Sequence, residues 1–286
     1  MQIIHTKAEL RSLCDQRHKE GKSICLVPTM GYYHAGHMDL MRSGRTLADT
    51  LVVSLFVNPT QFGPNEDLES YPTDKTKDAS IAEQCGCDLL FMPEPSEMYA
   101  QDHSTWVDVP EMGKLLCGAS RPIHFRGVCT IVLKLFTLTH AEYAVFGQKD
   151  WQQQAILKRM VRDLDVPITI TTRPTVREDD GLALSSRNVY LSGEERGEAP
   201  HIFAGLKLAA SMAANGERNP ICLRDAVLQY WAKNIPHGRL DYLTIVDPET
   251  LQTQSDLTRP SIMACAVRLG SARLIDNILL PVPDKA

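Results

Sequence analysis

The chain has 286 residues, of which 43% are hydrophobic, and a formal net charge of −5. That charge gives no electrostatic case for a nucleic-acid partner, and no apolar run approaches the roughly 20 residues that a membrane span needs. The N-terminus lacks the long apolar region of a signal peptide, so we expect a cytoplasmic protein, with about two domains for a chain of this length.

Apolar runs alternate with helical patterns in the first part of the chain. Strands that alternate with helices build βαβ units, so this order predicts an α/β fold with a Rossmann-like, doubly wound parallel sheet. Ligands of such sheets bind at the carboxyl ends of the strands. In chain order we expect a helix ending near residue 20, a strand at 24–27, a helix at 37–48, a strand at 51–57, a helix at 74–85, a strand at 88–92, a helix at 128–139, a strand at 143–146, a helix at 151–164 and a strand at 168–171.

The polar stretch 177–181 breaks this alternation, and we place the domain boundary there. Residues 1–177 form the expected sheet domain, and residues 178–286 form a smaller C-terminal α+β domain. In the second domain we expect helices at 194–215 and 220–233 and strands at 242–246, 261–266 and 272–278.

Segment 24–37 is the most informative of the chain. The apolar run 24–27 predicts a buried strand, and a helical pattern begins at His34-Ala-Gly36-His37. A strand, a tight turn and a helix N-terminus form a phosphate-binding site, because the first N–H groups of a helix have no partners within it. We expect the two histidines to add donors to the same anion and Gly36 to allow close approach of a nucleotide. The alternative is a plain strand-to-helix turn with two surface histidines.

The strand expected at 51–57 ends in a loop that carries Gln61. An amide can both donate to a carboxylate and accept from a hydroxyl, which makes Gln61 a candidate ligand. The alternative is that Asn58 and Gln61 only satisfy the backbone of the loop. The connection 62–71 is long and irregular, as active-site lids often are.

The strand expected at 143–146 leads into Gly147-Gln-Lys149-Asp150. Gly147 permits close approach, Lys149 can meet a phosphate, and Asp150 could bind a ribose hydroxyl. Gln153 lies one helical turn after Asp150 and on the same face. An ordinary helix cap would also explain Asp150.

The sequence Leu184-Ser-Ser-Arg187-Asn188 follows the boundary. Two hydroxyls and a guanidinium suit a triphosphate, because Arg offers a rigid fork of donors to phosphate oxygens. A solvated loop has the same composition. Positive groups also gather in segment 121–127, ahead of a helix, as a weaker candidate for the same site.

These clusters are rich in phosphate donors, and they lack a nucleophile with a paired base. Neither G-x-S-x-G nor the P-loop motif GxxxxGK[ST] occurs in the chain. The chemistry that they imply is attack on a nucleotide phosphate, with catalysis by charge stabilisation and positioning.

The eight cysteines include one close pair, Cys85-Gly-Cys87. No second pair or His-x-x-x-His completes a zinc set, so we expect reduced core residues, with metal or redox chemistry as the alternative.

Several motifs together resemble one family, the pantoate–β-alanine ligases (pantothenate synthetases), within the wider HxGH nucleotidylyltransferase group. The resemblance covers nearly the whole chain and keeps the order of the family. The motifs are Pro28-Thr-Met-Gly-x-x-His34-x-Gly-His37, Phe56-Val-Asn-Pro-x-Gln61-Phe-Gly, His124-Phe-Arg-Gly-Val, Phe146-Gly-x-Lys149-Asp-x-Gln-Gln153, Asp179-x-Gly-Leu-Ala-x-Ser-Ser-Arg187-Asn and Gly270-x-x-Arg-Leu-Ile-Asp-Asn277.

The resemblance implies a two-step ligation. The carboxylate of pantoate attacks the α-phosphate of ATP, with Mg²⁺ on the phosphates, and gives pantoyl adenylate and pyrophosphate. The amine of β-alanine then attacks the acyl group and releases pantothenate and AMP. The resemblance also implies a homodimer in which residues 178–286 act as a lid domain, and it leaves the protein ligands of the metal unknown.

By the same resemblance, His34 and His37 stabilise charge on the phosphates, and neutral amides hold pantoate so that its carboxylate stays nucleophilic. The catalytic residues would be His34, His37, Lys149 and Arg187. The ATP-binding residues would be Met30, Gly31, Tyr32, Tyr33, His34, Ala35, Gly36, His37, Gly147, Gln148, Lys149, Asp150, Val176, Leu184, Ser185, Ser186 and Arg187, and the pantoate-binding residues Gln61 and Gln153.

The chain departs from the family pattern at Tyr32, Tyr33, Gln148 and Leu184, which flank matched residues. These departures concern nucleotide affinity more than the reaction. One alternative is another HxGH nucleotidylyltransferase with a phosphate-ester acceptor, which should have basic residues in place of Gln61 and Gln153. A non-catalytic nucleotide-binding module is the other alternative.

Overall fold

The computed structural model describes residues 1–64 and 66–281, which divide into two compact units. Unit 1 comprises Met1–Lys114, Gly118–Gln148 and Ile156–Pro174. Unit 2 comprises Leu115–Cys117, Lys149–Ala155 and the chain from Thr175 onward. The functional division into a nucleotide-binding domain 1–177 and a lid domain 178–286 stays a prediction.

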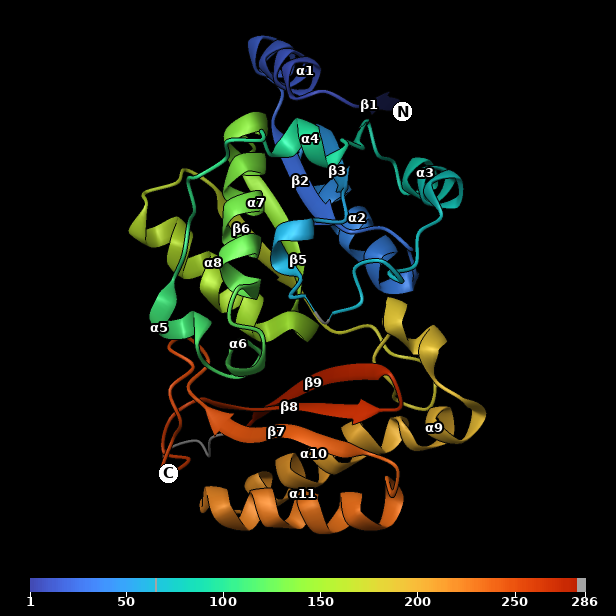
Figure 1. Cartoon of the computed structure of the whole chain (residues 1–286). Coiled ribbons are helices and arrows are strands. Elements are labelled where there is room, and N and C mark those ends of the chain that lie inside the picture. Colours follow the sequence, from blue (N-terminus) through green and yellow to red (C-terminus); the bar gives the residue numbers. More distant parts are fainter. Residues whose placement is uncertain (65, 282–286) are drawn as a thin grey trace. The chain divides into compact units, whose positions relative to one another are not determined.

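Unit 1 is built on a six-stranded sheet in the order β1-β4-β3-β2-β5-β6, in which every neighbouring pair is parallel (Figure 1). This confirms the Rossmann-like sheet, although β1 was not expected, because three residues are too few to show a period. The strands are β1 (Gln2–Ile4), β2 (Ile24–Thr29), β3 (Thr50–Leu55), β4 (Leu89–Phe91), β5 (Tyr143–Gly147) and β6 (Thr169–Arg173).

Helices cover both faces of this sheet. On one face α2 and α3 pack against alternate residues of β2, β3 and β4, and α7 contacts β2 from the other face and packs against α1. The long helices of this part of the chain are α1 (Lys7–Lys19), α2 (Ala35–Leu47), α3 (Lys75–Gln84), α7 (His124–Thr139) and α8 (Trp151–Asp163), and the short ones are η1 (Pro59–Gln61), α4 (Pro95–Met98), α5 (Pro110–Gly113), α6 (Cys117–Ser120) and η2 (Gln148–Asp150).

The strand order of the sheet reverses between β2 and β5, which are neighbours although β3 and β4 separate them in the chain. From this point β2, β3 and β4 follow one another toward one edge of the sheet, and β5 and β6 follow one another toward the other edge. Ligands of open parallel sheets bind outside the carboxyl ends of the strands at such a reversal. Segment 30–37 follows β2 and Gly147 ends β5, so the sheet of unit 1 places these parts of the two main motifs where a ligand is expected.

Unit 2 contains an antiparallel sheet in the order β7-β8-β9, with α10 packed against α11 and against β9. The prediction of one helix at 194–215 is wrong, because the segment forms two helices, and the second begins at Pro200. A proline lacks the N–H that would continue the hydrogen bonds of the first helix. The elements are η3 (Ser186–Tyr190), α9 (Gly193–Glu198), α10 (Pro200–Ala214), α11 (Pro220–Asn234), β7 (Arg239–Val246), β8 (Ser261–Leu269) and β9 (Ala272–Leu280).

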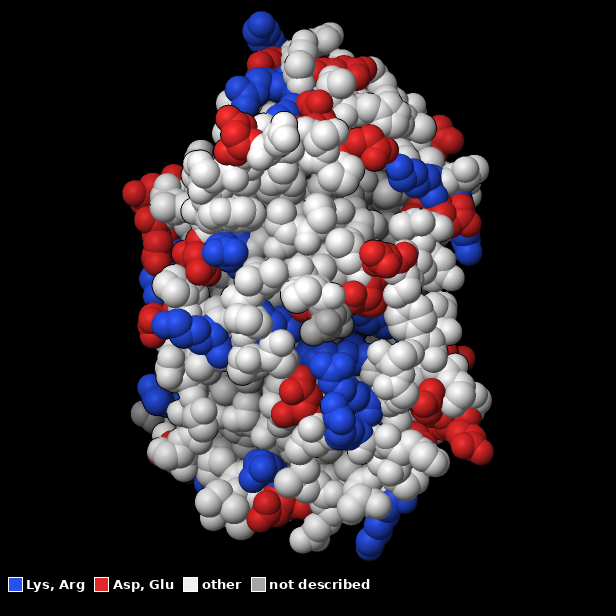
Figure 2. Space-filling view, in the orientation of Figure 1, with Lys and Arg blue, Asp and Glu red and all other residues white. Residues whose placement is uncertain are grey.

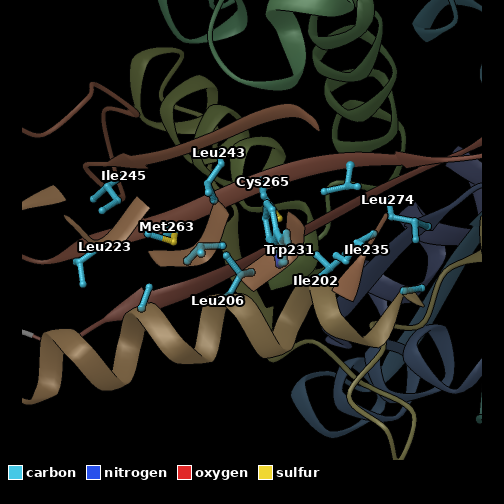
Figure 3. Close-up of a cluster of buried hydrophobic side chains, with 14 of the residues drawn as sticks. Ile202, Leu206, Leu223, Trp231, Ile235, Leu243, Ile245, Met263, Cys265 and Leu274 are labelled. Atoms are coloured by element: carbon cyan, nitrogen blue, oxygen red, sulfur yellow. The ribbon is translucent and has the colours of Figure 1, made fainter. Parts of the chain in front are cut away.

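The core of unit 2 lies between these helices and the sheet, where Leu206, Trp231 and Met263 are among the buried side chains (Figure 3). Gly205 brings α10 close to α11, because a Cβ atom at this position would lie 2.3 Å from the Trp231 Nε1 atom. That nitrogen also donates a hydrogen bond of 3.0 Å to the His201 carbonyl, so the indole is held in place.

We expect Gly205→Ala to destabilise the protein. Overpacking a filled core costs about 1–3 kcal/mol, which exceeds the roughly 1 kcal/mol that alanine gains over glycine in a helix. Urea unfolding followed by tryptophan fluorescence measures the change. Gly197→Ala is the matched control, because a Cβ at Gly197 would meet no atom within 4 Å apart from its chain neighbours and the backbone of its own helix. A Gly205 variant as stable as this control would contradict the packing described for α10 and α11.

All eight cysteines lie within the described residues and are free, and seven of them are buried, as expected. On the face drawn in Figure 2, basic side chains are interspersed with acidic ones, and even the largest basic group has an acidic neighbour. No helix among residues 1–64 and 66–281 combines the length and the apolar character of a membrane span.

Candidate functional site

His34 and His37 cap the N-terminus of α2 together. His34 is the N-cap residue, and its Nδ1 accepts a hydrogen bond of 3.1 Å from the Gly36 N–H. The His34 N–H in turn donates to His37 Nδ1 over 3.4 Å, and the two ring centroids lie 4.2 Å apart. A neutral imidazole that accepts at Nδ1 carries its proton at Nε2. In the neutral form each ring therefore carries its proton at Nε2, and both rings lie beside the N-terminus of α2, a place that suits a phosphate.

The turn before α2 has an unusual backbone. Gly31 and Tyr32 have φ angles of +92° and +53°, both in the left-handed region that disfavours side chains. The side chain of Tyr33 is buried in the unit 1 core, where its hydroxyl lies 2.9 Å from Thr29 Oγ1. Burial raises the pKa of Tyr33 above its ordinary value. Tyr33, one of the departures from the family pattern, thus packs its ring in the core and places its hydroxyl next to Thr29.

Gln61 ends η1, which begins four residues after the end of β3, and only 7% of Gln61 is exposed. Its Nε2 atom donates to the Met30 sulfur over 3.1 Å, and its Oε1 atom accepts from Asn58 Nδ2 over 3.0 Å. The structure thus brings a predicted pantoate ligand into contact with a predicted ATP ligand, because β2 and β3 are adjacent parallel strands whose carboxyl ends meet at one edge.

The N-terminal part of α7 holds the Gln61 segment in place. His124 Nδ1 lies 3.0 Å from the Gln61 carbonyl oxygen, and Arg121, just before α7, donates to the same oxygen over 3.5 Å. A Cβ atom at Gly127 would lie 2.5 Å from the carbonyl oxygen of Thr60. The motif His124-Phe-Arg-Gly is therefore a support for Gln61, a role that the sequence did not indicate.

Tyr99 is a further support that sequence reasoning missed. Its hydroxyl donates to Asn58 Oδ1 over 2.9 Å and lies 3.1 Å from Thr60 Oγ1. Asn58 Nδ2 also donates to the Gly127 carbonyl over 3.2 Å. The side chain of Asn58 thus bonds to the Gln61 side chain and to the backbone of α7, and it orients Gln61.

In unit 2, Lys149 lies on η2 among charged groups. Burial lowers the pKa of its ammonium group, the Asp150 carboxylate counteracts this effect, and the positive charge of Arg187 lowers the pKa further. Both of these predicted catalytic residues belong to unit 2. Two cations in a partly buried place stabilise a negatively charged ligand, because such a ligand relieves their mutual repulsion.

Strand β9 fixes the backbone around Lys149. Asn277 Nδ2 on β9 donates to the Lys149 carbonyl over 3.0 Å. The neighbouring Asp276 accepts two hydrogen bonds from the Arg177 guanidinium, at 2.7 and 2.8 Å. The C-terminal motif that ends at Asn277 therefore serves this segment, which lies 128 residues earlier in the chain.

The loop with the two serines is ordered by its own side chains. Ser185 is the N-cap residue of η3, and its hydroxyl accepts from the Arg187 N–H over 3.3 Å. Leu184 N–H donates to the Val176 carbonyl over 3.0 Å, which brings two predicted ATP ligands together. These bonds set the start of the segment that carries Arg187.

The two neighbouring glutamines of α8 have different environments. Gln152 is buried, and its amide bonds to the backbone of Leu115 and Cys117 at 2.7 and 2.9 Å. Gln153 is half-buried, and within the described part of the chain its side chain forms no hydrogen bond. The role of Gln153 as a pantoate ligand stays a prediction.

A family model, curated relatives and solved structures that resemble this chain all carry the name of one enzyme family. A family model described as pantoate-beta-alanine ligase matches residues 2–279. The chain is 63% identical over 280 residues to the pantothenate synthetase of Desulfovibrio desulfuricans, covering 98% of this chain and 99% of that protein. The crystal structure of the pantothenate synthetase from Thermus thermophilus superposes with a TM-score of 0.93 at 43% identity, covering 99% and 100% of the two chains.

A third relative was crystallised with ligands. The pantoate-beta-alanine ligase of Francisella tularensis, complexed with "Beta-gamma ATP" and beta-alanine, superposes with a TM-score of 0.80 at 31% identity. The match covers 98% of this chain and 97% of that one.

Proposed function

Because this chain belongs to the pantoate-beta-alanine ligase family, we propose that the residues at its strand ends catalyse ligation through an acyl adenylate. The chain is an ATP-using ligase that joins pantoate to β-alanine and forms pantothenate. The observation that best supports the proposed route is the His34–His37 capping box, which places two imidazole rings at a helix N-terminus, where phosphates bind.

In the first step a pantoate carboxylate oxygen attacks the α-phosphorus of ATP. The new P–O bond forms as the bond to the bridging oxygen breaks, and pyrophosphate leaves with the electron pair. We propose that His34, His37, Lys149 and Arg187 stabilise the charge that develops on the phosphates, with His37 as proton donor. Such donors act most strongly where the developing charge is shielded from water.

In the second step the amine of β-alanine attacks the acyl carbon. The C–N bond forms, the C–O bond to the phosphate breaks, and AMP leaves as the amine loses its proton. We propose that Gln61 and Gln153 hold pantoate through both steps. Amides bind its hydroxyls and carboxylate without the positive charge that would make the carboxylate a poorer nucleophile.

We propose that the enzyme uses Mg²⁺, forms a homodimer and lies in the cytoplasm. No three His, Cys, Asp or Glu side chains gather as metal ligands among the residues that the structure describes. We therefore propose that the phosphates of ATP are the main ligands of a Mg²⁺ ion, which would neutralise part of their charge. We also propose a homodimer, which light scattering tests, and a cytoplasmic location, where thiols such as the free cysteines here stay reduced.

Exchange of labelled pyrophosphate into ATP tests the adenylate route. The first step is reversible, so we expect exchange that depends on pantoate and needs no β-alanine. A nucleotidylyltransferase with a phosphate-ester acceptor would show exchange with such an ester instead. Exchange that is absent with pantoate would contradict the proposed intermediate.

We expect Gln153→Ala to raise the KM for pantoate about tenfold and to change the KM for ATP less than twofold. The lost hydrogen bonds to a polar ligand correspond to about 1.4 kcal/mol, within the range for such bonds. Steady-state kinetics with each substrate varied in turn measures both constants. Lys158→Ala, at an exposed position on the same helix, is the control. A larger effect on the KM for ATP would show that Gln153 has been assigned to the wrong substrate.

A further inference from the structure

Asp78 is a buried carboxylate for which the proposed reaction has no use. It lies on α3 in unit 1, and only 1% of it is exposed. Charged side chains are rarely buried to this extent without partners that hold them. Among the described residues, the hydrogen-bond partners of the Asp78 carboxylate are backbone N–H groups of the turn that precedes α2.

Both carboxylate oxygens of Asp78 bond to that turn. The Tyr32 N–H donates to Oδ2 and the Tyr33 N–H donates to Oδ1, each over 2.7 Å. The two bonds join parts of the chain that are 46 and 45 residues apart. Burial raises the pKa of Asp78, and the two N–H donors act in the opposite direction by stabilising its charge.

The conformation of the turn matches this partner. Gly31 and Tyr32 both have positive φ angles, and successive N–H groups in such a turn converge on an anion. A Cβ atom at Gly31 would lie 2.9 Å from Asp78 Oδ2, so a side chain here would displace the carboxylate. The glycine, the unfavourable φ of Tyr32 and the buried charge are thus parts of one arrangement.

We propose that Asp78 is a positioning residue for the ATP-binding turn formed by residues 30–34. It ties the turn to α3, and this sets His34 as the N-cap residue of α2 and orients the two imidazole rings toward the nucleotide. This inference rests on the proposed function, since it concerns the residues that are assigned to ATP there. Asp78 acts through the turn and does not itself touch the substrate.

Asp78→Asn tests the proposal. The asparagine has nearly the same shape, but it offers one acceptor oxygen and turns an NH₂ group toward the second N–H. We expect at least a tenfold rise in the Kd for ATP, measured by calorimetry without pantoate, and a similar loss in kcat/KM for ATP in pyrophosphate exchange. The KM for pantoate should change less than twofold.

Asp74→Ala is the matched control. Asp74 is the N-cap residue of the same helix, where its Oδ1 atom accepts from the Lys77 N–H over 3.0 Å, and no hydrogen bond joins it to the turn. This variant lowers the melting temperature by weakening α3, and we expect its Kd for ATP to stay within twofold of the parent value. Should Asp78→Asn fail to fold, Asp78→Ser removes the charge without the opposed NH₂ group and gives the same comparison.

The outcomes separate the two claims. If the parent protein shows no pantoate-dependent exchange, the proposed function fails. If the parent exchanges and the Asp78 variant binds ATP as tightly as the parent, the positioning role is wrong. The role is also wrong if Asp74→Ala weakens ATP binding to the same degree, because the effect would then come from the stability of α3 alone.

Discussion

Replacement of His37 by alanine is expected to lower the rate of pantoate-dependent pyrophosphate exchange by about 10²–10³-fold, the usual cost of removing a donor that stabilises a transition-state charge. The protein should stay folded, because the lost cap bond spans 3.4 Å and is weak. Rapid-quench or isotope exchange assays measure the rate, and thermal unfolding checks the fold.

Two further variants at His37 separate capping from catalysis. An asparagine places its amide near the position of the imidazole Nδ1, so His37→Asn keeps an acceptor for the His34 N–H but lacks a donor near Nε2. A glutamine reaches further, so His37→Gln supplies an N–H donor near the position of Nε2. We expect His37→Asn to be as inactive as His37→Ala and His37→Gln to recover part of the rate. Equal activity of His37→Asn and His37→Gln would contradict the role given to the Nε2–H group.

Gly127→Ala is expected to impair pantoate use and stability together. A Cβ atom at this position would lie 2.5 Å from the Thr60 carbonyl oxygen and 2.7 Å from the Gln61 nitrogen. These are backbone atoms that no side-chain rotation can move away, so η1 must shift relative to α7. We expect a loss of about 1–3 kcal/mol in the free energy of unfolding, in spite of the better helix propensity of alanine.

The same shift would move Gln61 away from Met30 and pantoate. We expect the KM for pantoate to rise at least tenfold, more than the KM for ATP rises. Urea unfolding and steady-state kinetics measure the two effects, with Gly197→Ala as the control for a glycine to which a methyl group can be added freely. A Gly127 variant with unchanged pantoate kinetics would mean that the position of Gln61 does not depend on α7.

The sequence predicted the parallel sheet because β2 and β3 are continuous apolar runs, typical of strands that are buried on both faces. It predicted the place of His34 and His37 for a similar reason, since a strand, a turn and a helix follow one another within fourteen residues, 24–37. The break at Pro200 was missed because helical periodicity continues on both sides of it. Local patterns therefore identify most elements, and their ends less well.

The supports of the site could not be predicted, because they come from distant parts of the chain. The Asp78 carboxylate meets the turn before α2 across 46 residues, and Asn277 meets the backbone of Lys149 across 128 residues. Nothing in the local sequence distinguishes Asp78 from an exposed helix residue. The side chains that would touch the substrates were visible as motifs, whereas the residues that hold them are visible only in the fold.

The most direct test of the proposed reaction is the amount of AMP that the purified protein forms from ATP and Mg²⁺ when pantoate and β-alanine are supplied together and singly. The proposal predicts sustained AMP formation, in amounts equal to the pantothenate formed, only when both acids are present. Sustained release of AMP without β-alanine, or formation of ADP in place of AMP, would contradict it.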